Sequence, residues 1–230
     1  MSGTDDRPGM SEHWVSECAV LYPEACAGWA EQVLSLRSQW TARHVSLPFY
    51  TLGMAAYLDA VPSASRAGGP IPYHSTALRQ HHNRLLQDKF APLLDLTCEA
   101  LGRWAKRRTH CNAATTALPG FHIHLEHPVF MHSVASKHRD LQFQLVFPGR
   151  EIALSQVLTF TLPLSLPEGA GLNLWSNGTS YFHPYHLGQV TVHSGLAPHQ
   201  AVLFPGTLRP PRVMLQGHGL IVNDSLLLYW

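Results

Sequence analysis

His138 and Asp140 form the pair of residues in this sequence whose types and spacing are suited to chemistry. One residue separates them, so on a β-strand both side chains would point to the same face. A buried carboxylate is costly unless a partner neutralises it, and a metal ion would do so. Imidazole and carboxylate are typical ligands of divalent iron, and two histidines with one carboxylate leave coordination positions open for reactants. The pair therefore predicts two of the three protein ligands of a metal site.

The tripeptide His138-Arg139-Asp140 also occurs in protein kinases, where the motif continues to an Asn that binds a second metal ion. In this chain the position of that Asn is Leu145. The chain has no D-F-G motif and no G-x-G-x-x-G motif near its start, and 230 residues are few for a kinase. The sequence therefore excludes a kinase.

Three histidines in the C-terminal part of the chain, His193, His199 and His218, are candidates for the third ligand. Pro205-Gly206 is a strong turn signal, and a hairpin about this turn would place residue 199 opposite residue 212. Residue 212 is Arg, so His199 and Arg212 would project from neighbouring strands onto one face. The guanidinium could then pair with the far carboxylate of a dicarboxylic acid that chelates the metal. This geometry favours His199, and we expect the other two to be core histidines or neighbours of the metal ligands.

The order His138-x-Asp140, His199, Arg212 resembles the H-x-D…H…R/K pattern of the Fe(II)- and 2-oxoglutarate-dependent oxygenases. The match covers residues 120–219. The resemblance implies a jelly-roll core in which His138, Asp140 and His199 hold Fe(II). It also implies that 2-oxoglutarate binds the metal with its far carboxylate on Arg212, and that O2 takes the last open position. It implies no catalytic residue beyond the metal ligands.

The reaction that this resemblance implies is the decarboxylation of 2-oxoglutarate to succinate and CO2, coupled to hydroxylation or oxidative demethylation of a small-molecule substrate. The substrate itself is not predicted. Many members of the family have a hydroxyl residue two positions after the Arg, and here that residue is Met214. The second contact of the carboxylate is therefore left open among Thr159, Tyr181 and Tyr185.

Apolar residues at helical spacing predict one or two amphipathic helices between residues 13 and 40 and a longer helical segment over residues 75–108. Pro92 is expected to kink this segment or to begin a second helix. Residues 62–73 are rich in Pro, Gly and Ser and predict a loop. Residues 1–12 have the composition of a disordered lead-in.

After about residue 117 the sequence changes to short apolar runs between turn residues, and these runs are FHIHL, LQFQLVF, VLTFTLPL, LNLW, QVTVHS, AVLF, RVMLQ and LIVN. Such a series predicts an antiparallel sandwich or barrel. With the resemblance, the expected fold is mainly β with α. A jelly-roll (double-stranded β-helix) catalytic core would span residues 117–230, with N-terminal supporting helices over residues 13–110, in a single domain of residues 1–230.

Two other classes of function remain open. One is a non-catalytic jelly-roll that binds a ligand, and the other is a cupin-like metal enzyme that does not use 2-oxoglutarate. The run FHIHLEH offers His122 and His124 as a rival pair of ligands, but Glu126 is too close to them for the cupin spacing. Arg212 separates these classes, because only the oxygenase needs it. The aromatic residues of segment 49–60 either line a substrate mouth or pack in the core.

The composition limits the partners. Sixteen Lys and Arg residues oppose fifteen Asp and Glu residues, and this near balance does not favour nucleic acid. The first thirty residues do not resemble a secretory signal, and no apolar run is long enough for a membrane span. Four cysteines without C-x-x-C spacing fit a reducing compartment. We therefore expect a cytoplasmic protein that acts on a small molecule without a membrane partner, and the oligomeric state is not predicted.

Overall fold

The structure is a computed structural model that describes residues 14–61, 71–176, 178–206 and 209–230. The predicted lead-in at residues 1–12 and most of the predicted loop at residues 62–73 lie outside these ranges.

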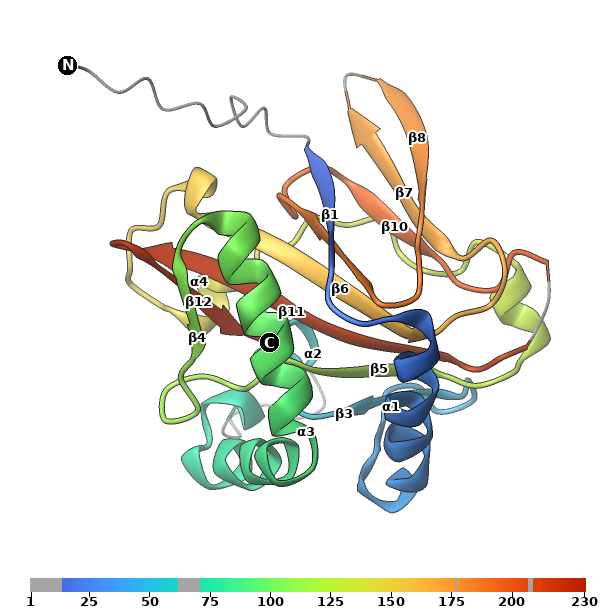
Figure 1. The fold of residues 1–230 in the computed structure, drawn as a ribbon, viewed down its shortest axis with the longest axis horizontal. Helices are drawn as coiled ribbons and strands as arrows, with labels where there is room; N and C mark the ends of the chain where they lie inside the picture. Colours follow the sequence, from blue (N-terminus) through green and yellow to red (C-terminus); the bar gives the residue numbers. More distant parts are fainter. Residues whose placement is uncertain (1–13, 62–70, 177, 207–208) are drawn as a thin grey trace.

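A large, mainly antiparallel sheet is the centre of the fold (Figure 1). Among the described residues it has nine strands in the order β1-β9-β6-β11-β5-β3-β2, with β12 paired to β11 and β4 paired in parallel to β12. The strands are β1 (Val15–Ala19), β2 (Thr41–Ala42), β3 (Phe49–Leu52), β4 (Arg108–Cys111), β5 (Gly120–His124), β6 (Val157–Ser165), β9 (Gln189–His193), β11 (Arg212–Val222) and β12 (Ser225–Tyr229). The predicted β-rich C-terminal half is confirmed, and the N-terminal half adds strands that the sequence pattern did not predict.

A second, three-stranded sheet has the order β10-β7-β8, formed by β10 (His199–Val202), β7 (Gly171–Ser176) and β8 (Thr179–Pro184). The predicted hairpin between the strands on either side of Pro205-Gly206 is therefore wrong. His199 lies opposite Leu174 in the small sheet, and Arg212 lies opposite His124 in the main sheet. The two strands separate because β11 gains ladder hydrogen bonds along both of its edges in the main sheet, which a two-stranded hairpin cannot provide.

The predicted strand LQFQLVF is also wrong, because this segment forms the short helix α4 (Phe143–Val146). Phe143, Val146 and Phe147 have the spacing i, i+3, i+4, and they pack into one cluster with Leu196 and Leu220. The alternating pattern of the segment was compatible with a strand, but the same residues bury their apolar side chains on one side of a helical turn.

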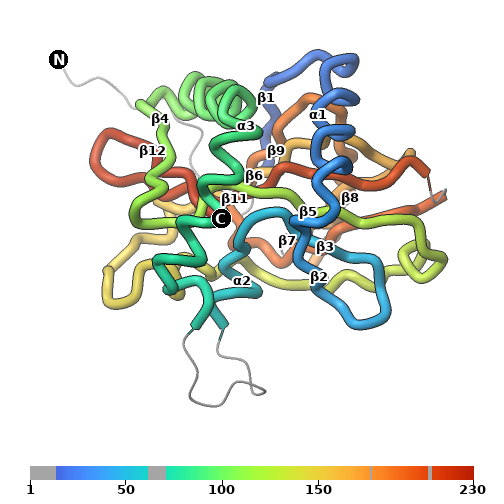
Figure 2. The backbone as a smooth tube through the Cα atoms, turned by 90° about the horizontal axis from the view of Figure 1, so that it is seen from below, coloured from blue at the N-terminus to red at the C-terminus, as the bar shows by residue number. Residues whose placement is uncertain are grey.

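Two helices, α1 (Pro23–Ser35) and α3 (Thr76–Ala105), lie on one side of the main sheet (Figures 1 and 2). Their buried residues, including Val33, Phe90 and Leu93, pack with Phe121 and Leu215 of the sheet in the largest core cluster. The predicted supporting helices are thus present. The helix α3 continues through Pro92 without a second start.

Alternation along β11 gives the main sheet one apolar face and one polar face. Val213 and Leu215 belong to the core beneath the helices, whereas Arg212 and Gln216 line a cavity on the opposite face. The register places His124 of β5 beside Arg212. Polar side chains of neighbouring strands therefore meet on the face that the helices leave free.

The remaining short helices are α2 (Ala56–Asp59) and the 3-10 turns η1 (Arg37–Gln39), η3 (Pro72–His74), η4 (Pro128–Met131) and η5 (Leu154–Gln156). In the described part of the chain, every helix is too short or too polar to cross a membrane.

Candidate functional site

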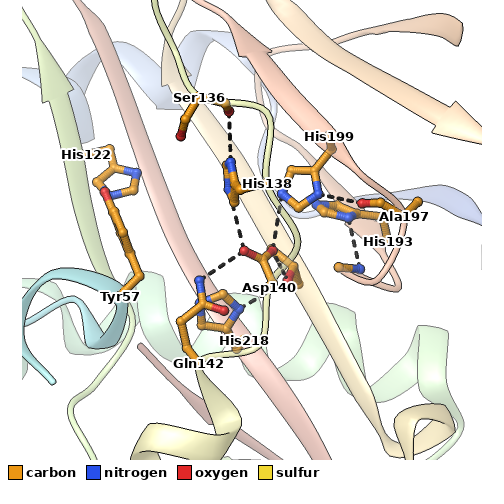
Figure 3. A network of polar contacts seen from close by, with 12 residues as sticks. Tyr57, His122, Ser136, His138, Asp140, Gln142, His193, Ala197, His199 and His218 are labelled. Atoms are coloured by element: carbon orange, nitrogen blue, oxygen red, sulfur yellow. Dashed lines mark hydrogen bonds and ion pairs between the residues drawn. The ribbon is translucent and has the colours of Figure 1, made fainter. Parts of the chain in front are cut away.

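His138, Asp140 and His199 converge on one point, and their ligand atoms all lie within 4.8 Å of one another (Figure 3). The distance is 3.6 Å from His138 Nε2 to Asp140 Oδ1 and 3.4 Å from His199 Nε2 to Asp140 Oδ2. We call these three residues the triad. The structure thus brings together the three residues that the sequence selected as metal ligands.

Backbone hydrogen bonds, and not a regular strand, hold the first two residues of the triad in place. The N–H of His138 donates to the carbonyl of His199 (3.0 Å), and the N–H of His199 donates to the carbonyl of His138 (2.9 Å). The N–H of Asp140 donates to the carbonyl of Gly195 (2.7 Å). An isolated bridge to the start of β10 therefore replaces the predicted strand at residues 138–140.

Both histidines of the triad direct a free ring nitrogen at the carboxylate. His138 Nδ1 lies 2.9 Å from the carbonyl of Ser136, and His199 Nδ1 lies 2.9 Å from the carbonyl of Ala197. Because a carbonyl can only accept, each Nδ1 carries a hydrogen, and Nε2 is the atom left for a metal ion. This second hydrogen bond is the usual way in which proteins orient a metal-ligating histidine, so the donor set fits a divalent cation such as Fe(II).

The Asp140 carboxylate is buried and held by neutral donors. Thr159 Oγ1 donates to Asp140 Oδ2 at 2.6 Å, and Gln142 Nε2 donates to Asp140 Oδ1 at 3.0 Å. The hydroxyl of Thr159 has one hydrogen, so it accepts from His218 Nδ1, which lies 3.1 Å away. The polar atoms of Thr159 are therefore used by Asp140 and His218, and Thr159 is a poor candidate for the second contact of an organic carboxylate.

The triad has the electrostatics of a cation site. Burial by itself would raise the pKa of Asp140, but His199, His218 and His193 hold this pKa well below its usual range. Burial lowers the pKa of His199, and the Asp140 carboxylate overcomes this effect and raises it. Asp140 is therefore an ionised carboxylate that stabilises positive charge beside it.

Arg212 is a buried cation without a carboxylate partner in the described part of the chain. It is 4% exposed, and its Nε has no hydrogen-bond partner. Burial lowers its pKa, and its guanidinium carbon lies 5.8 Å from the centroid of the Tyr185 ring. A buried charge without a counterion is costly, so Arg212 favours the binding of an anion.

One cavity of about 410 Å³ connects the triad with Arg212. The triad borders it from β10 and the loop before α4, and Arg212 borders it from β11. The two strands belong to different sheets that face each other across the cavity. His199 and Arg212 therefore share one cavity because their two sheets face each other, and not because their strands form the predicted hairpin.

Tyr185 is the best placed of the three candidates for the second contact of an organic carboxylate. Tyr185 is buried, lies close enough to Thr161 for this residue to affect the pKa of its hydroxyl, and lines the same cavity as Thr161 and Arg212. Tyr181 is 37% exposed on β8 and does not line the cavity. Met214 is fully buried against Tyr185. Thr161 was missed, although it follows Thr159 at the strand spacing of two that places both residues on one face.

His122 and His124, the rival pair of ligands, lie in the same cavity but belong to no group of potential metal ligands among the described residues. His122 Nε2 is 2.8 Å from the hydroxyl of Tyr57, and the ring of His124 stacks on Phe49 at 4.4 Å. Burial, followed by the charge of Arg212, lowers the pKa of His122 to about 3 and that of His124 well below its usual value. Both imidazoles are therefore neutral.

Segment 49–60 contributes residues both to the cavity and to the core. Phe49 and Tyr57 line the cavity, whereas Leu52, Met54 and Ala56 are buried in the core. In Figure 3, Tyr57 and His122 stand on the side of His138 that faces away from His199.

No family model and no curated protein matches this sequence. Solved structures do match it. The chain aligns with an N-substituted L-amino acid dioxygenase from Burkholderia ambifaria, solved in complex with alpha-ketoglutarate, with a TM-score of 0.55 and 10% identity over 94% of this chain and 86% of that one. It also aligns with the non-heme alpha-ketoglutarate-dependent epimerase SnoN from nogalamycin biosynthesis, with a TM-score of 0.51 and 13% identity over 94% of both chains. The chain therefore has the jelly-roll fold of the Fe(II)- and 2-oxoglutarate-dependent oxygenases.

Proposed function

We propose that this chain is an Fe(II)- and 2-oxoglutarate-dependent oxygenase that acts on a small molecule. The observation that carries the proposal is the cavity of about 410 Å³ that contains both the triad and a buried arginine without a counterion. A cation site and an anion site on opposite walls of one cavity suit a ligand that binds a metal through one end and carries a carboxylate at the other. The likeness in fold to a dioxygenase solved with alpha-ketoglutarate supports the proposal.

In this proposal His138, Asp140 and His199 hold the iron. The carbonyl groups of Ser136 and Ala197 fix the two imidazoles with Nε2 facing the carboxylate. Thr159 and Gln142 each donate a hydrogen bond to a different oxygen of Asp140. These contacts set the direction of all three ligand atoms before the ion binds, so the side chains lose little conformational entropy on metal binding.

Arg212 would bind the far carboxylate of 2-oxoglutarate. Its guanidinium can offer two parallel N–H donors to a carboxylate, which a lysine cannot do. Tyr185 and Thr161 lie in the same part of the lining and would supply a neutral hydroxyl donor in place of the hydroxyl residue that position 214 lacks. The second contact is therefore assigned to the Tyr185–Thr161 pair.

Bound iron would supply the activation of O2, with 2-oxoglutarate oxidised to succinate and CO2 while a C–H bond of the substrate is oxidised. The chain itself would orient the two reactants and exclude water. The apolar residues around the cavity, such as Phe49, Phe130 and Leu203, serve this exclusion. Hydroxylation and oxidative demethylation both fit this arrangement.

The test measures succinate production from 2-oxoglutarate by the protein supplied with Fe(II), together with binding of 2-oxoglutarate to the Mn(II)-loaded protein by calorimetry. We expect Asp140→Ala to abolish metal binding and turnover. The control Asp95→Ala removes an exposed carboxylate of α3 and should change neither. Wild-type protein that binds neither the metal nor 2-oxoglutarate would overturn the proposal, and metal binding that is insensitive to 2-oxoglutarate would favour a cupin-like enzyme instead.

A further inference from the structure

In the described part of the chain, the part of the cavity that remains after the metal and 2-oxoglutarate are placed has no further carboxylate, ammonium or guanidinium group. Among the described residues that line the cavity, Asp140 and Arg212 are the only Asp, Glu, Lys or Arg side chains. Both are already used in the proposed function. The imidazoles of His122 and His124 border the remaining space and are neutral, because burial lowers the pKa of each. A charged substrate group would therefore enter this space without a counterion, at a high cost in desolvation.

One side of the remaining space is an apolar wall formed by Leu47, Phe49, Phe130 and Leu203. Phe49 stacks on His124 with ring centroids 4.4 Å apart and planes only 9° from parallel. Phe130 meets the edge of the same imidazole, with centroids 5.3 Å apart and planes 82° apart. These rings are fixed against one another and present flat faces and edges, which suits the packing of a planar ring.

Next to this wall lies a hydrogen-bonded pair, Tyr57 and His122, whose hydroxyl and Nε2 are 2.8 Å apart, and the ring of Phe49 meets the His122 imidazole edge-on with centroids 5.5 Å apart. Tyr57 belongs to α2, and this helix is anchored by a bidentate ion pair in which Arg43 donates to both oxygens of Asp59 at 2.7 Å. Arg43 Nε also donates to Thr51 Oγ1 of β3 at 2.7 Å. The phenol is therefore held firmly, and after its bond to His122 it retains the capacity for another hydrogen bond.

The size of the cavity limits the substrate to a small molecule. A volume of about 410 Å³ is near the lower end of the range of roughly 300–1,000 Å³ that small-molecule sites occupy. Part of that volume would be taken by 2-oxoglutarate. The remaining space suits one ring or two fused rings and not a folded polymer.

We propose that the substrate is an uncharged molecule built on a planar apolar ring, with a hydroxyl or carbonyl group that hydrogen bonds to the Tyr57–His122 pair. This inference rests on the proposed function, because the charge balance of the cavity assumes that the metal and 2-oxoglutarate occupy the triad and Arg212. The ring packs against the apolar wall, and the hydrogen bond fixes its orientation.

A series of naphthalenes with matched shape and different charge tests the proposal. The protein is first loaded with Mn(II) and 2-oxoglutarate, and binding of both is verified by calorimetry. The dissociation constants of 2-naphthol, 2-naphthoate and 2-naphthylmethylammonium are then measured by ligand-observed NMR. We expect 2-naphthol to bind at least about tenfold more tightly than either charged probe, since each charged group would be buried without a partner.

Three variants locate the binding. Phe49→Leu should weaken the binding of 2-naphthol, whereas Phe182→Leu, at an aromatic residue of β8 that is 46% exposed and outside the cavity, should not. Tyr57→Phe should weaken the binding of 2-naphthol by roughly 3- to 10-fold, which corresponds to one hydrogen bond. The same variant should leave 2-methylnaphthalene unaffected, because that probe has no hydroxyl group.

The outcomes separate this inference from the proposed function. If Mn(II) and 2-oxoglutarate bind but a charged probe binds as tightly as 2-naphthol or more tightly, the inference is overturned and the proposed function stands. Failure of every probe to bind the loaded protein overturns it as well. If 2-oxoglutarate itself does not bind, the proposed function is overturned, and the inference that rests on it is overturned with it. The charge series uses the wild-type protein, so it decides the matter even if a variant does not fold.

Discussion

Replacement of Arg212 by methionine should raise the stability of the protein while it removes the binding of 2-oxoglutarate. Arg212 is buried in the fold without a carboxylate partner in the described part of the chain, and its Nε has no hydrogen bond. Methionine keeps most of the length of the side chain and removes the charge. The fold would therefore lose an uncompensated cation and keep the contacts of the aliphatic stem.

The expected magnitudes are large enough to measure. A buried polar group without a partner costs about 1–3 kcal/mol, and because Arg212 borders a cavity that water can enter, we take the lower half of this range. A gain of about 1–2 kcal/mol corresponds to an increase in Tm of roughly 2–8 °C for a chain of this size. Loss of a buried charge pair costs about 2–5 kcal/mol of binding energy, so the affinity for 2-oxoglutarate should fall by roughly 30-fold or more.

The assays are thermal unfolding of the ligand-free protein and calorimetric titration of the Mn(II)-loaded protein with 2-oxoglutarate. Arg103→Met is the matched control, because Arg103 is an exposed residue of α3 that is 3.9 Å from Glu99. It should change neither quantity by much. A clear loss of stability in Arg212→Met would show that the guanidinium has a structural partner, and an unchanged affinity for 2-oxoglutarate would refute its assignment as the carboxylate anchor.

Three further changes test the surroundings of the site. Thr159→Val removes the donor to Asp140 Oδ2 and should weaken metal affinity by about 10- to 100-fold in a Mn(II) titration; unchanged affinity would contradict this role. In Gly195→Ala the new Cβ would lie 2.7 Å from Thr159 Oγ1 and 2.9 Å from Asp140 Cβ, so metal affinity should fall. Gly149 has a similar positive φ but open space around the position of a Cβ, so the control Gly149→Ala should lower only the stability of the fold. The folded state keeps the pKa of His122 at about 3, so below pH 6.5 the unfolded state binds a proton that the folded state excludes. As the pH is lowered below 6.5, the free energy of unfolding should fall by up to about 1.4 kcal/mol per pH unit because of this residue. Urea unfolding between pH 5 and 7 should show a smaller pH dependence of this free energy in His122→Gln than in the wild type, and an equal dependence would contradict the prediction.

The sequence by itself determined the chemistry that the site could contain. His138, Asp140, His199 and Arg212 were selected by residue type and order, and all four border one cavity in the structure. Selection by type can single out such residues because few side chains can hold a divalent cation or a carboxylate, and their roles as ligands stay a prediction. The runs of β-branched and aromatic residues also predicted the β-rich second half, since strand periodicity is a local property of the sequence.

Only the tertiary structure decided how these residues meet. The local pattern predicted a strand over residues 141–147, but packing makes this segment a short helix. It also predicted a hairpin of β10 and β11, but the two strands lie in different sheets. The Tyr57–His122 pair joins residues 65 positions apart. Strand partners and such long-range contacts depend on which edges and faces become buried together, and a single sequence carries no local signal for that choice.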